Sequence, residues 1–283
     1  MTLAADVCTV EGSELAAPST FVVTSLAFTA DHAFIAGDDE VHAYAVTSDA
    51  TGCSLTLDNA MGDDGALDVG TTPMSTVSAT PTGRVVTSGV LGTKVFDTDS
   101  GASYECEDVT GNVIVHPSGT YAYRWFPGSP VTRVELGDSK CTEGPEVPMP
   151  FPEVVFLAFD GDGVLVGGKD AAGTMTAARS VDGTATWQHG NPTTSDEDAL
   201  GWLHGAAPCG EGYCLADTNF DRLQVLDGAG VHRASFAITE VLGLPRGFTR
   251  TMVSGPGGAP FVLTSVTEGG TTFGYVARLG DGT

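Results

Sequence analysis

The stretch VHPSGTYAYRW, residues 115–125, followed by RVELGDS at residues 133–139, contains the features that decide the fold. An apolar strand leads into a Pro- and Gly-containing turn, a second strand follows, and a third strand ends in a turn with Asp. The first part of this unit recurs in FTADHAFIAG from Phe28, ATPTGRVVTSG from Ala79, AFDGDGVLVGG from Ala158, AAPCGEGYCLAD from Ala206 and VSGPGGAPFVLTS from Val253. These segments start 51, 36, 43, 48 and 47 residues apart, a period typical of repeated sheets.

A second feature of the repeat is an aspartate in a later turn, whose side chain can accept hydrogen bonds from nearby backbone N–H groups. The six copies are Asp49, Asp99, Asp138, Asp182, Asp227 and Asp281. The intervening runs are strand-like, and none has helical periodicity over three turns. The sequence therefore predicts an all-β chain.

The repeat predicts one domain, residues 1–283, folded as a six-bladed β-propeller, with seven blades as the alternative. The last repeat ends at Asp281 after its third strand, FGYVARL, and so lacks a fourth. The segment AADVCTVEG, residues 4–12, has no other place in the repeat. We expect this N-terminal segment to supply the missing outer strand of the last blade, because that pairing removes two open sheet edges.

The composition is that of a folded, turn-rich and acidic chain, with 41% hydrophobic residues, 38 Gly and a formal charge of −24. This charge repels phosphate, so nucleic acid is not expected as a partner. The acidity fits a solvated surface, and it also fits Ca²⁺ binding, a basic partner or a salty habitat. No apolar run approaches 18 residues, so membrane insertion is not expected.

The six cysteines have no spacing that indicates zinc or a redox pair, which favours disulfides. We predict the pairs Cys8 with Cys53, Cys106 with Cys141, and Cys209 with Cys214, although 15 connectivities are open. Disulfides indicate a secreted, periplasmic or cell-surface protein, with Met1 in place of a removed signal segment. Reduced, buried thiols in a cytosolic protein are the alternative.

Two resemblances to known propellers follow from these motifs. SVDGTATW, residues 180–187, resembles the Asp-box turn of sialidase-like propellers, and residues 97–104 form a more degenerate copy. ATPTGRVV with KVFDTDSG, and VHPSGTYAY with RVELGDS, look like the YVTN-type and lactonase-like repeats. Both resemblances imply a propeller, and the first says little about sialidase activity because its motif is a folding device.

The lactonase-like resemblance also implies one enzymatic alternative, a Ca²⁺-dependent lactonase or esterase-like hydrolase with a central metal site. Its candidate oxygen ligands are Asn112 and Glu153 at the starts of inner strands and Asp68 in a loop. Other inner-strand starts carry Thr76, Trp202 and Arg250 instead. No serine elbow or HxxxH pair is present, although His189 and His204 could approach each other.

The function that the sequence favours is a non-catalytic extracytoplasmic propeller that needs no cofactor and binds a protein or glycan partner. Loops between blades, and loops from second to third strands, gather on one face of a propeller. On that face we expect a binding surface of exposed aromatic residues and an arginine. Its members are Trp125, Phe126, Trp202, Phe220 and Arg246. Packing between blades is the alternative role, above all for Trp125 and Trp202.

Overall fold

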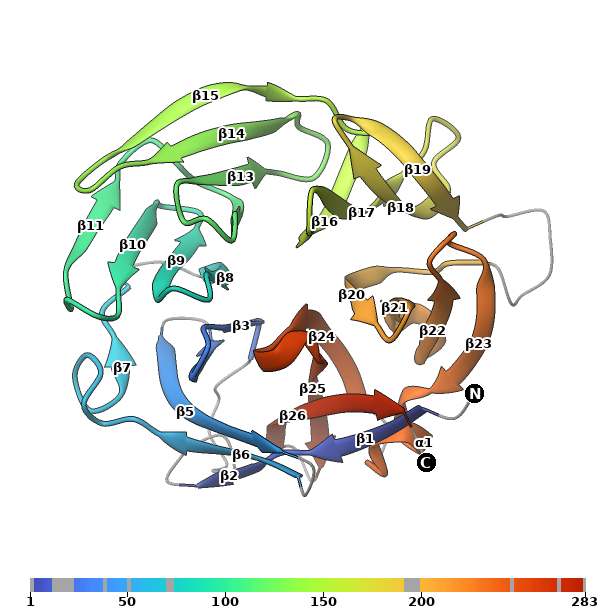
Figure 1. Ribbon diagram of the computed structural model, residues 1–283, viewed down its shortest axis with the longest axis horizontal. Coiled ribbons are helices and arrows are strands. Elements are labelled where there is room, and N and C mark those ends of the chain that lie inside the picture. Colours follow the sequence, from blue (N-terminus) through green and yellow to red (C-terminus); the bar gives the residue numbers. More distant parts are fainter. Residues whose placement is uncertain are drawn as a thin grey trace.

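The fold is a ring of β-sheets around an open centre (Figure 1). The structure is a computed structural model that describes residues 3–11, 23–37, 40–49, 52–69, 74–190, 199–244, 247–268 and 271–281. Within these ranges nearly all of the regular secondary structure is strand, and the two ends of the chain lie close together at the outer rim (Figure 1). The prediction of an all-β chain in a propeller arrangement is therefore confirmed.

The first half of the ring consists of three sheets in which consecutive strands are antiparallel neighbours. The first sheet contains β3 (Ser25–Phe28), β4 (His32–Ala36), β5 (Val41–Asp49) and β6 (Gly52–Leu57), with β2 (Thr9–Glu11) beside β6 and β7 (Ala66–Leu67) beside β5. The second contains β8 (Met74–Ala79), β9 (Arg84–Gly89), β10 (Thr93–Asp97) and β11 (Ser103–Cys106). The third contains β12 (Asn112–Val115), β13 (Tyr121–Trp125), β14 (Val131–Leu136) and β15 (Cys141–Val147).

The second half of the ring has two sheets. One contains β16 (Glu153–Asp160), β17 (Gly163–Lys169), β18 (Met175–Val181) and β19 (Thr184–His189). The other has eight strands: β20 (Leu203–Cys209), β21 (Gly212–Asp217), β22 (Arg222–Asp227) and β23 (His232–Ala237), then β24 (Gly247–Ser254), β25 (Pro260–Glu268), β26 (Thr271–Asp281) and β1 (Leu3–Val7). Among the described residues of this half, three short helices interrupt the strands: η2 (Thr218–Phe220), α1 (Ile238–Leu242) and η3 (Pro256–Gly258).

The predicted count of six separate sheets, or seven, is corrected by the eight-stranded sheet, which leaves five hydrogen-bonded sheets. Its two four-stranded halves are joined by one parallel pairing, Gly205 of β20 with Met252 of β24. A Cβ atom at Gly205 would lie 2.5 Å from the Met252 nitrogen, so only glycine permits this approach. The junction therefore depends on a residue that turn and strand patterns do not reveal.

Hydrophobic side chains fill the spaces between neighbouring groups of four strands. Among the described residues they form six clusters, and each cluster draws its members from two successive groups. Between the first and last groups, for example, Phe28 of β3 packs against Phe261 of β25 with ring centroids 4.5 Å apart. The core is thus distributed around the ring, and inner strands such as β4 and β17 bury side chains on both of their faces, whereas the outer strands β15 and β23 have no buried residue.

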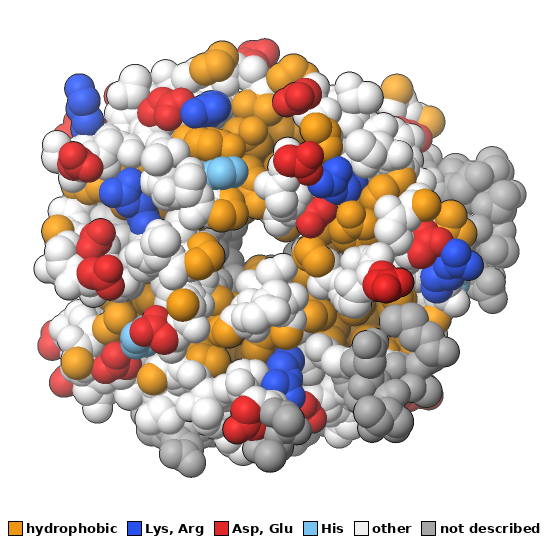
Figure 2. Space-filling view, in the orientation of Figure 1, with side chains coloured by type: hydrophobic (Ala, Val, Ile, Leu, Met, Phe, Trp, Pro, Cys, Tyr) orange, Lys and Arg blue, Asp and Glu red, His pale blue; other side chains and the backbone are white. Residues whose placement is uncertain are grey.

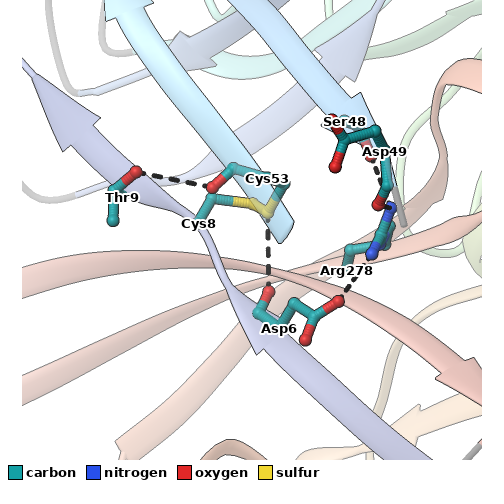
Figure 3. Close-up of a disulfide and its surroundings, with 7 residues drawn as sticks. All are labelled: Asp6, Cys8, Thr9, Ser48, Asp49, Cys53 and Arg278. Carbon is teal, nitrogen blue, oxygen red and sulfur yellow. Dashed lines mark hydrogen bonds and ion pairs between the residues drawn. A yellow bond between two sulfur atoms is a disulfide. The ribbon is translucent and has the colours of Figure 1, made fainter. Parts of the chain in front are cut away.

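The N-terminal segment closes the ring, as predicted, because β1 pairs antiparallel with β26 from Leu3 opposite Asp281 to Val7 opposite Ala277. The prediction of one strand is refined, since β2 leaves the last group of strands and pairs parallel with β6 of the first sheet. Cys8 lies between the two strands and forms a disulfide with Cys53 of β6 (Figure 3). The segment therefore joins both ends of the ring, and we call this region the outer seam.

The structure contains the three disulfides that the sequence predicts. Cys8–Cys53, Cys106–Cys141 and Cys209–Cys214 have Cα separations of 4.6, 5.3 and 5.5 Å, within the range for disulfides. The second joins β11 to β15 at the outer edges of neighbouring sheets, and the third spans the β20–β21 turn. Outer strands of adjacent sheets can therefore approach closely enough to be crosslinked.

Several of the repeat's turns are stabilised by aspartate, although not always by the predicted residue. The Asp227 carboxylate accepts hydrogen bonds from the backbone nitrogens of Ala229 and Val231, both 2.9 Å away. In the second sheet Asp97, and not the predicted Asp99, accepts the hydrogen bond from the Ser100 nitrogen. Asp182 lies in the turn between β18 and β19 with a φ of 49°, a conformation that aspartate tolerates better than most residues.

Candidate functional site

A cavity of about 770 Å³ lies at the centre of the ring, a volume typical of small-molecule sites. Figure 2 shows a central opening with hydrophobic side chains around it, whereas charged side chains are mostly further out. Its walls are the innermost strands β3, β8, β12, β16, β20 and β24, with adjoining turns. Apolar wall residues include Leu26, Val77, Ile114, Leu157 and Met252. The walls are therefore largely apolar, so the polar groups among them determine what the cavity can recognise.

Hydroxyl groups on one side of the cavity are used by the fold itself. The Ser25 hydroxyl of β3 accepts a hydrogen bond from the Val77 nitrogen of β8 at 3.2 Å. The Thr76 hydroxyl of β8 likewise accepts from the Val113 nitrogen of β12 at 3.1 Å. These bonds join neighbouring inner strands that have no backbone pairing with each other, so the hydroxyls serve to hold the wall together.

The opposite side of the cavity carries residues exposed by strand irregularities. Register shifts leave one residue without a cross-strand partner in each of three inner strands, namely Val155 in β16, His204 in β20 and Arg250 in β24. Such β-bulges re-aim a side chain and are common beside functional sites. All three residues line the cavity, so the bulges bring a histidine and an arginine to an otherwise apolar wall.

Arg250 and His204 give the cavity its polar character. The Arg250 Nε donates a hydrogen bond to the buried Ser265 hydroxyl at 2.9 Å, which holds the guanidinium in place. Burial, and then the positive charge of Arg250, lower the pKa of His204 below its usual value, so His204 is neutral at pH 7. Among the described wall residues there is no Asp or Glu. The cavity therefore presents one positive charge.

At the mouth of the cavity, Trp202 is half-buried and lies under the Lys169 ammonium, 5.4 Å from the ring centroid. Asp217 positions this tryptophan, because its carboxylate accepts hydrogen bonds from the Gly201 and Trp202 nitrogens at 3.1 and 3.2 Å. The Asp217 side chain is fully buried, which raises its pKa. The sequence indicated a binding surface and packing between blades as alternative roles for Trp202. The half-buried side chain at the rim of the cavity combines a packing contact with partial exposure.

The three predicted metal ligands are separated. Asp68 forms an ion pair with Lys94 at 3.1 Å, and Glu153 forms one with Lys169 at 2.6 Å. Of the three, only Asn112 lines the central cavity. Within the part of the chain that the structure describes, no group of three or more His, Cys, Asp or Glu side chains could hold a metal ion. The predicted three-ligand calcium site is therefore not assembled by these residues.

The predicted binding-surface residues divide into three cases. Trp125 is wrong as a surface residue, because it is only 3% exposed and its indole nitrogen donates to the Val155 carbonyl at 3.4 Å. Phe126 and Phe220 are 36% and 53% exposed. Arg246 lies outside the described residues. Trp125 is buried because it ends β13, one residue before the turn, so its side chain packs against the next sheet instead.

Two further exposed hydrophobic regions on the same face were missed by the sequence analysis. Val90 and Leu91, in the β9–β10 turn, are 62% and 66% exposed, and Phe248 near the start of β24 is 59% exposed. In an antiparallel sheet of consecutive strands, the start of the first strand and the turn from the second to the third strand lie at the same end of the strands. Hence these residues lie on the face of Phe126 and Phe220, which we call the loop face. The sequence signal that could have revealed Val90 and Leu91 was the presence of two apolar residues in the turn Val90-Leu91-Gly92.

Apolar exposure is concentrated on this loop face. Among the described residues, five of the six large exposed hydrophobic side chains are Val90, Leu91, Phe126, Phe220 and Phe248, and the sixth, Val231, lies in the β22–β23 turn at the opposite face. Arginines flank the phenylalanines, with the Arg124 and Arg222 guanidinium carbons 5.9 and 4.7 Å from the Phe126 and Phe220 ring centroids. Such exposed aromatic and arginine pairs are common in interfaces.

The histidines do not form a common site. His189 lies at the end of β19, where its Nε2 is 2.7 Å from the Gln224 amide oxygen and its ring is stacked 6.1 Å from that of His232. His32 bridges two carboxylates, with its ring nitrogens 2.9 Å from Asp31 and 2.9 Å from Asp58. His204 alone of these lines the central cavity. The two carboxylate contacts give His32 a structural role in the first sheet.

Comparisons with known proteins define the class by fold alone. No protein-family model matches the chain, and no curated protein matches it. Among solved structures, it is similar to the β-propeller domain of Cps50 (Swd1) from Myceliophteria thermophila, with 11% identity, a TM-score of 0.58, and coverage of 90% of this chain and 96% of that one. With the ring of sheets, this similarity shows that the chain has a β-propeller fold.

Proposed function

We propose that this chain is a non-catalytic binding propeller that engages a protein partner through its loop face. The observation that carries this proposal is the concentration of exposed Val90, Leu91, Phe126, Phe220 and Phe248 on one face. The first three belong to the second and third sheets, and the other two to the eight-stranded sheet. Residues spread over so much of the ring suit a macromolecular surface better than a small ligand.

The same proposal includes the architecture on which the surface is built. We infer that the eight-stranded sheet counts as two blades, because one residue pair joins its halves and a hydrophobic cluster lies between them. The ring then has six blades, and Phe126 and Phe220 lie on blades three and five, with only blade four, the sheet of β16 to β19, between them. The three disulfides are consistent with an oxidising, extracytoplasmic location.

The net charge of −24 favours a basic protein as the partner, because complementary charge accelerates association and disfavours acidic competitors. Exposed phenylalanines flanked by arginine supply the apolar contacts. Truncation of such an anchor weakens interfaces by tenfold or more. A partner that contacts both phenylalanines would have to extend across the sheet of β16 to β19, which lies between them.

The experiment that tests this function uses a photo-crosslinking amino acid placed at position 126, 220 or 231 in the full chain. We expect one protease-sensitive protein adduct to appear at positions 126 and 220 and not at position 231, which is equally exposed on the opposite face. The variant with Phe126→Ala and Phe220→Ala should lose this partner and retain its melting temperature within a few degrees. Equal capture at position 231, or adducts removed by glycosidases alone, would contradict a protein-binding loop face.

A further inference from the structure

We propose that the central cavity binds a small organic monocarboxylate with an apolar body, with its carboxylate on Arg250 and beside His204. This site is separate from the loop-face residues and does not depend on the proposed protein partner. The inference rests on three observations. The cavity has the size and apolar walls of a small-molecule site, the Arg250 side chain has a single acceptor among the described residues, and His204 lines the same part of the cavity.

Arg250 is unusual among the arginines of this chain. Of the eight described arginines, six form ion pairs with carboxylates: Arg124, Arg133, Arg179, Arg222, Arg233 and Arg278. A seventh, Arg84, donates to the Gly119 and Leu136 carbonyls. Arg250 donates only its Nε, to Ser265, and its two terminal nitrogens have no acceptor among the described residues.

An arginine without a carboxylate partner is informative in a chain with 36 Asp and Glu residues. Holding a partly buried guanidinium costs free energy unless its donors are satisfied. A planar guanidinium binds carboxylates through two parallel hydrogen bonds, so its natural ligand is a carboxylate group. Because the described cavity wall supplies no Asp or Glu, the carboxylate must come from a ligand.

The neighbouring residues restrict the ligand further. Its body must be apolar, because the walls offer side chains such as Leu26, Ile114 and Met252, and the hydroxyls of Ser25 and Thr76 are used between inner strands. Its charge must be small, because the described cavity wall presents a single cation and a second anionic group would find no further positive charge there. A monocarboxylate with an alkyl or aryl body satisfies both conditions.

His204 makes the site sensitive to pH. Burial, and then the positive charge of Arg250, lower the pKa of the free histidine, and the negative charge of a bound carboxylate would offset that of Arg250 and raise this pKa. Binding would therefore be accompanied by proton uptake. By linkage the affinity should increase as the pH falls through the pKa of His204 in the complex towards its lower pKa in the free protein.

The test is calorimetric titration of the full, oxidised chain with octanoate and with octanol, which has the same apolar body and no charge. We expect octanoate to bind at least tenfold more tightly at pH 7. In Arg250→Met the preference should disappear, whereas Arg233→Met, which removes a surface arginine paired with Asp227, should leave it unchanged. His204→Gln should keep the preference and lose the increase in affinity at lower pH.

Equal affinity for the two probes, absence of octanoate binding at millimolar concentration, or a preference that survives in Arg250→Met would overturn the proposal. If the Met variant does not fold, Arg250→Lys decides, because lysine keeps the charge and loses the planar fork. That variant should retain binding with a several-fold smaller preference, and an unchanged preference would overturn the role of Arg250. Neither result bears on partner capture at the loop face.

Discussion

The outer seam and the central cavity each contain an arginine from the last group of strands, and the surroundings of the two arginines differ. In the outer seam Arg278 of β26 donates to the Ser48 hydroxyl at 2.9 Å, the Asp49 carbonyl at 2.6 Å and the Asp6 carboxylate at 2.6 Å (Figure 3). In the cavity, Arg250 of β24 has only Ser265 as a described acceptor. The arginine of the seam has three acceptors, and the arginine of the cavity has one among the described residues.

This difference separates stability from function in the ring. A propeller must close its first and last sheets on each other, and here a strand pair, a disulfide and an arginine share that task. Functional sites commonly keep polar groups whose partners are supplied by a ligand, at some cost in stability. Changes in the seam should therefore lower stability, and changes at Arg250 should alter binding.

The largest effect is expected from deletion of residues 1–12. This removes β1, β2 and the Cys8 half of a disulfide, and it leaves β26 as an unpaired edge. The melting temperature should fall by about 10 °C or more, since about 4 to 5 kcal/mol is lost in a chain of this size. Differential scanning calorimetry measures it, and a change within 2 °C would contradict closure by the N-terminal segment.

A smaller loss is expected when the seam disulfide alone is removed by Cys8→Ser with Cys53→Ser. The bond links residues 45 apart, and the chain-entropy account predicts a loss of about 4 kcal/mol. The matched control is Cys209→Ser with Cys214→Ser, which opens a link between residues 5 apart and should cost about 2 kcal/mol. Denaturant unfolding compares the free energies of unfolding of the two variants. Equal losses would mean that the seam disulfide stabilises the fold no more than the short-range disulfide does.

The smallest change in stability is expected when each of the two arginines is replaced by methionine. Arg278→Met removes three hydrogen bonds from a side chain that is 18% exposed, beside an Asp6 side chain that is 53% exposed, and should lower the free energy of unfolding by about 1 to 2 kcal/mol. Arg250→Met removes one hydrogen bond and a partly buried charge, so its net effect should be below about 1 kcal/mol. Urea unfolding of both variants tests this, and a larger loss at Arg250 would make that residue structural.

Much of the fold could be predicted because its signals are local. Strand alternation and the aspartate- and glycine-containing turns are set by backbone geometry within a few residues, and a repeat with a missing last strand points to the N-terminal segment. The disulfide pairs followed from the same map, since Cys8 and Cys53 fall on outer strands that closure brings together. The division of residues 4–12 into two strands was not predicted, because it depends on the disulfide between Cys8 and Cys53, which lies between the two strands.

The candidate sites were only partly predictable, for a different reason. Phe126 and Phe220 were found on the correct face because turn positions determine the face. Trp125 was misplaced, since one residue decides whether a side chain lies in the turn or packs against the next sheet. His204 and Arg250 reach the cavity through β-bulges, which leave no mark in the sequence.

The sequence by itself determined the strands, their turns and the closure by the N-terminus, because each of these depends on neighbouring residues or on the count of strands. It favoured the three cysteine pairs, and the tertiary structure decided among the 15 possible connectivities. Only the tertiary structure decided that Gly205 meets Met252, that Trp125 is buried, and that Arg250 and His204 share the cavity wall. These contacts join strands of neighbouring groups, with 30 residues between Trp125 and Val155 and 47 between Gly205 and Met252. Their distances depend on how the ring packs around its centre, which no local pattern specifies.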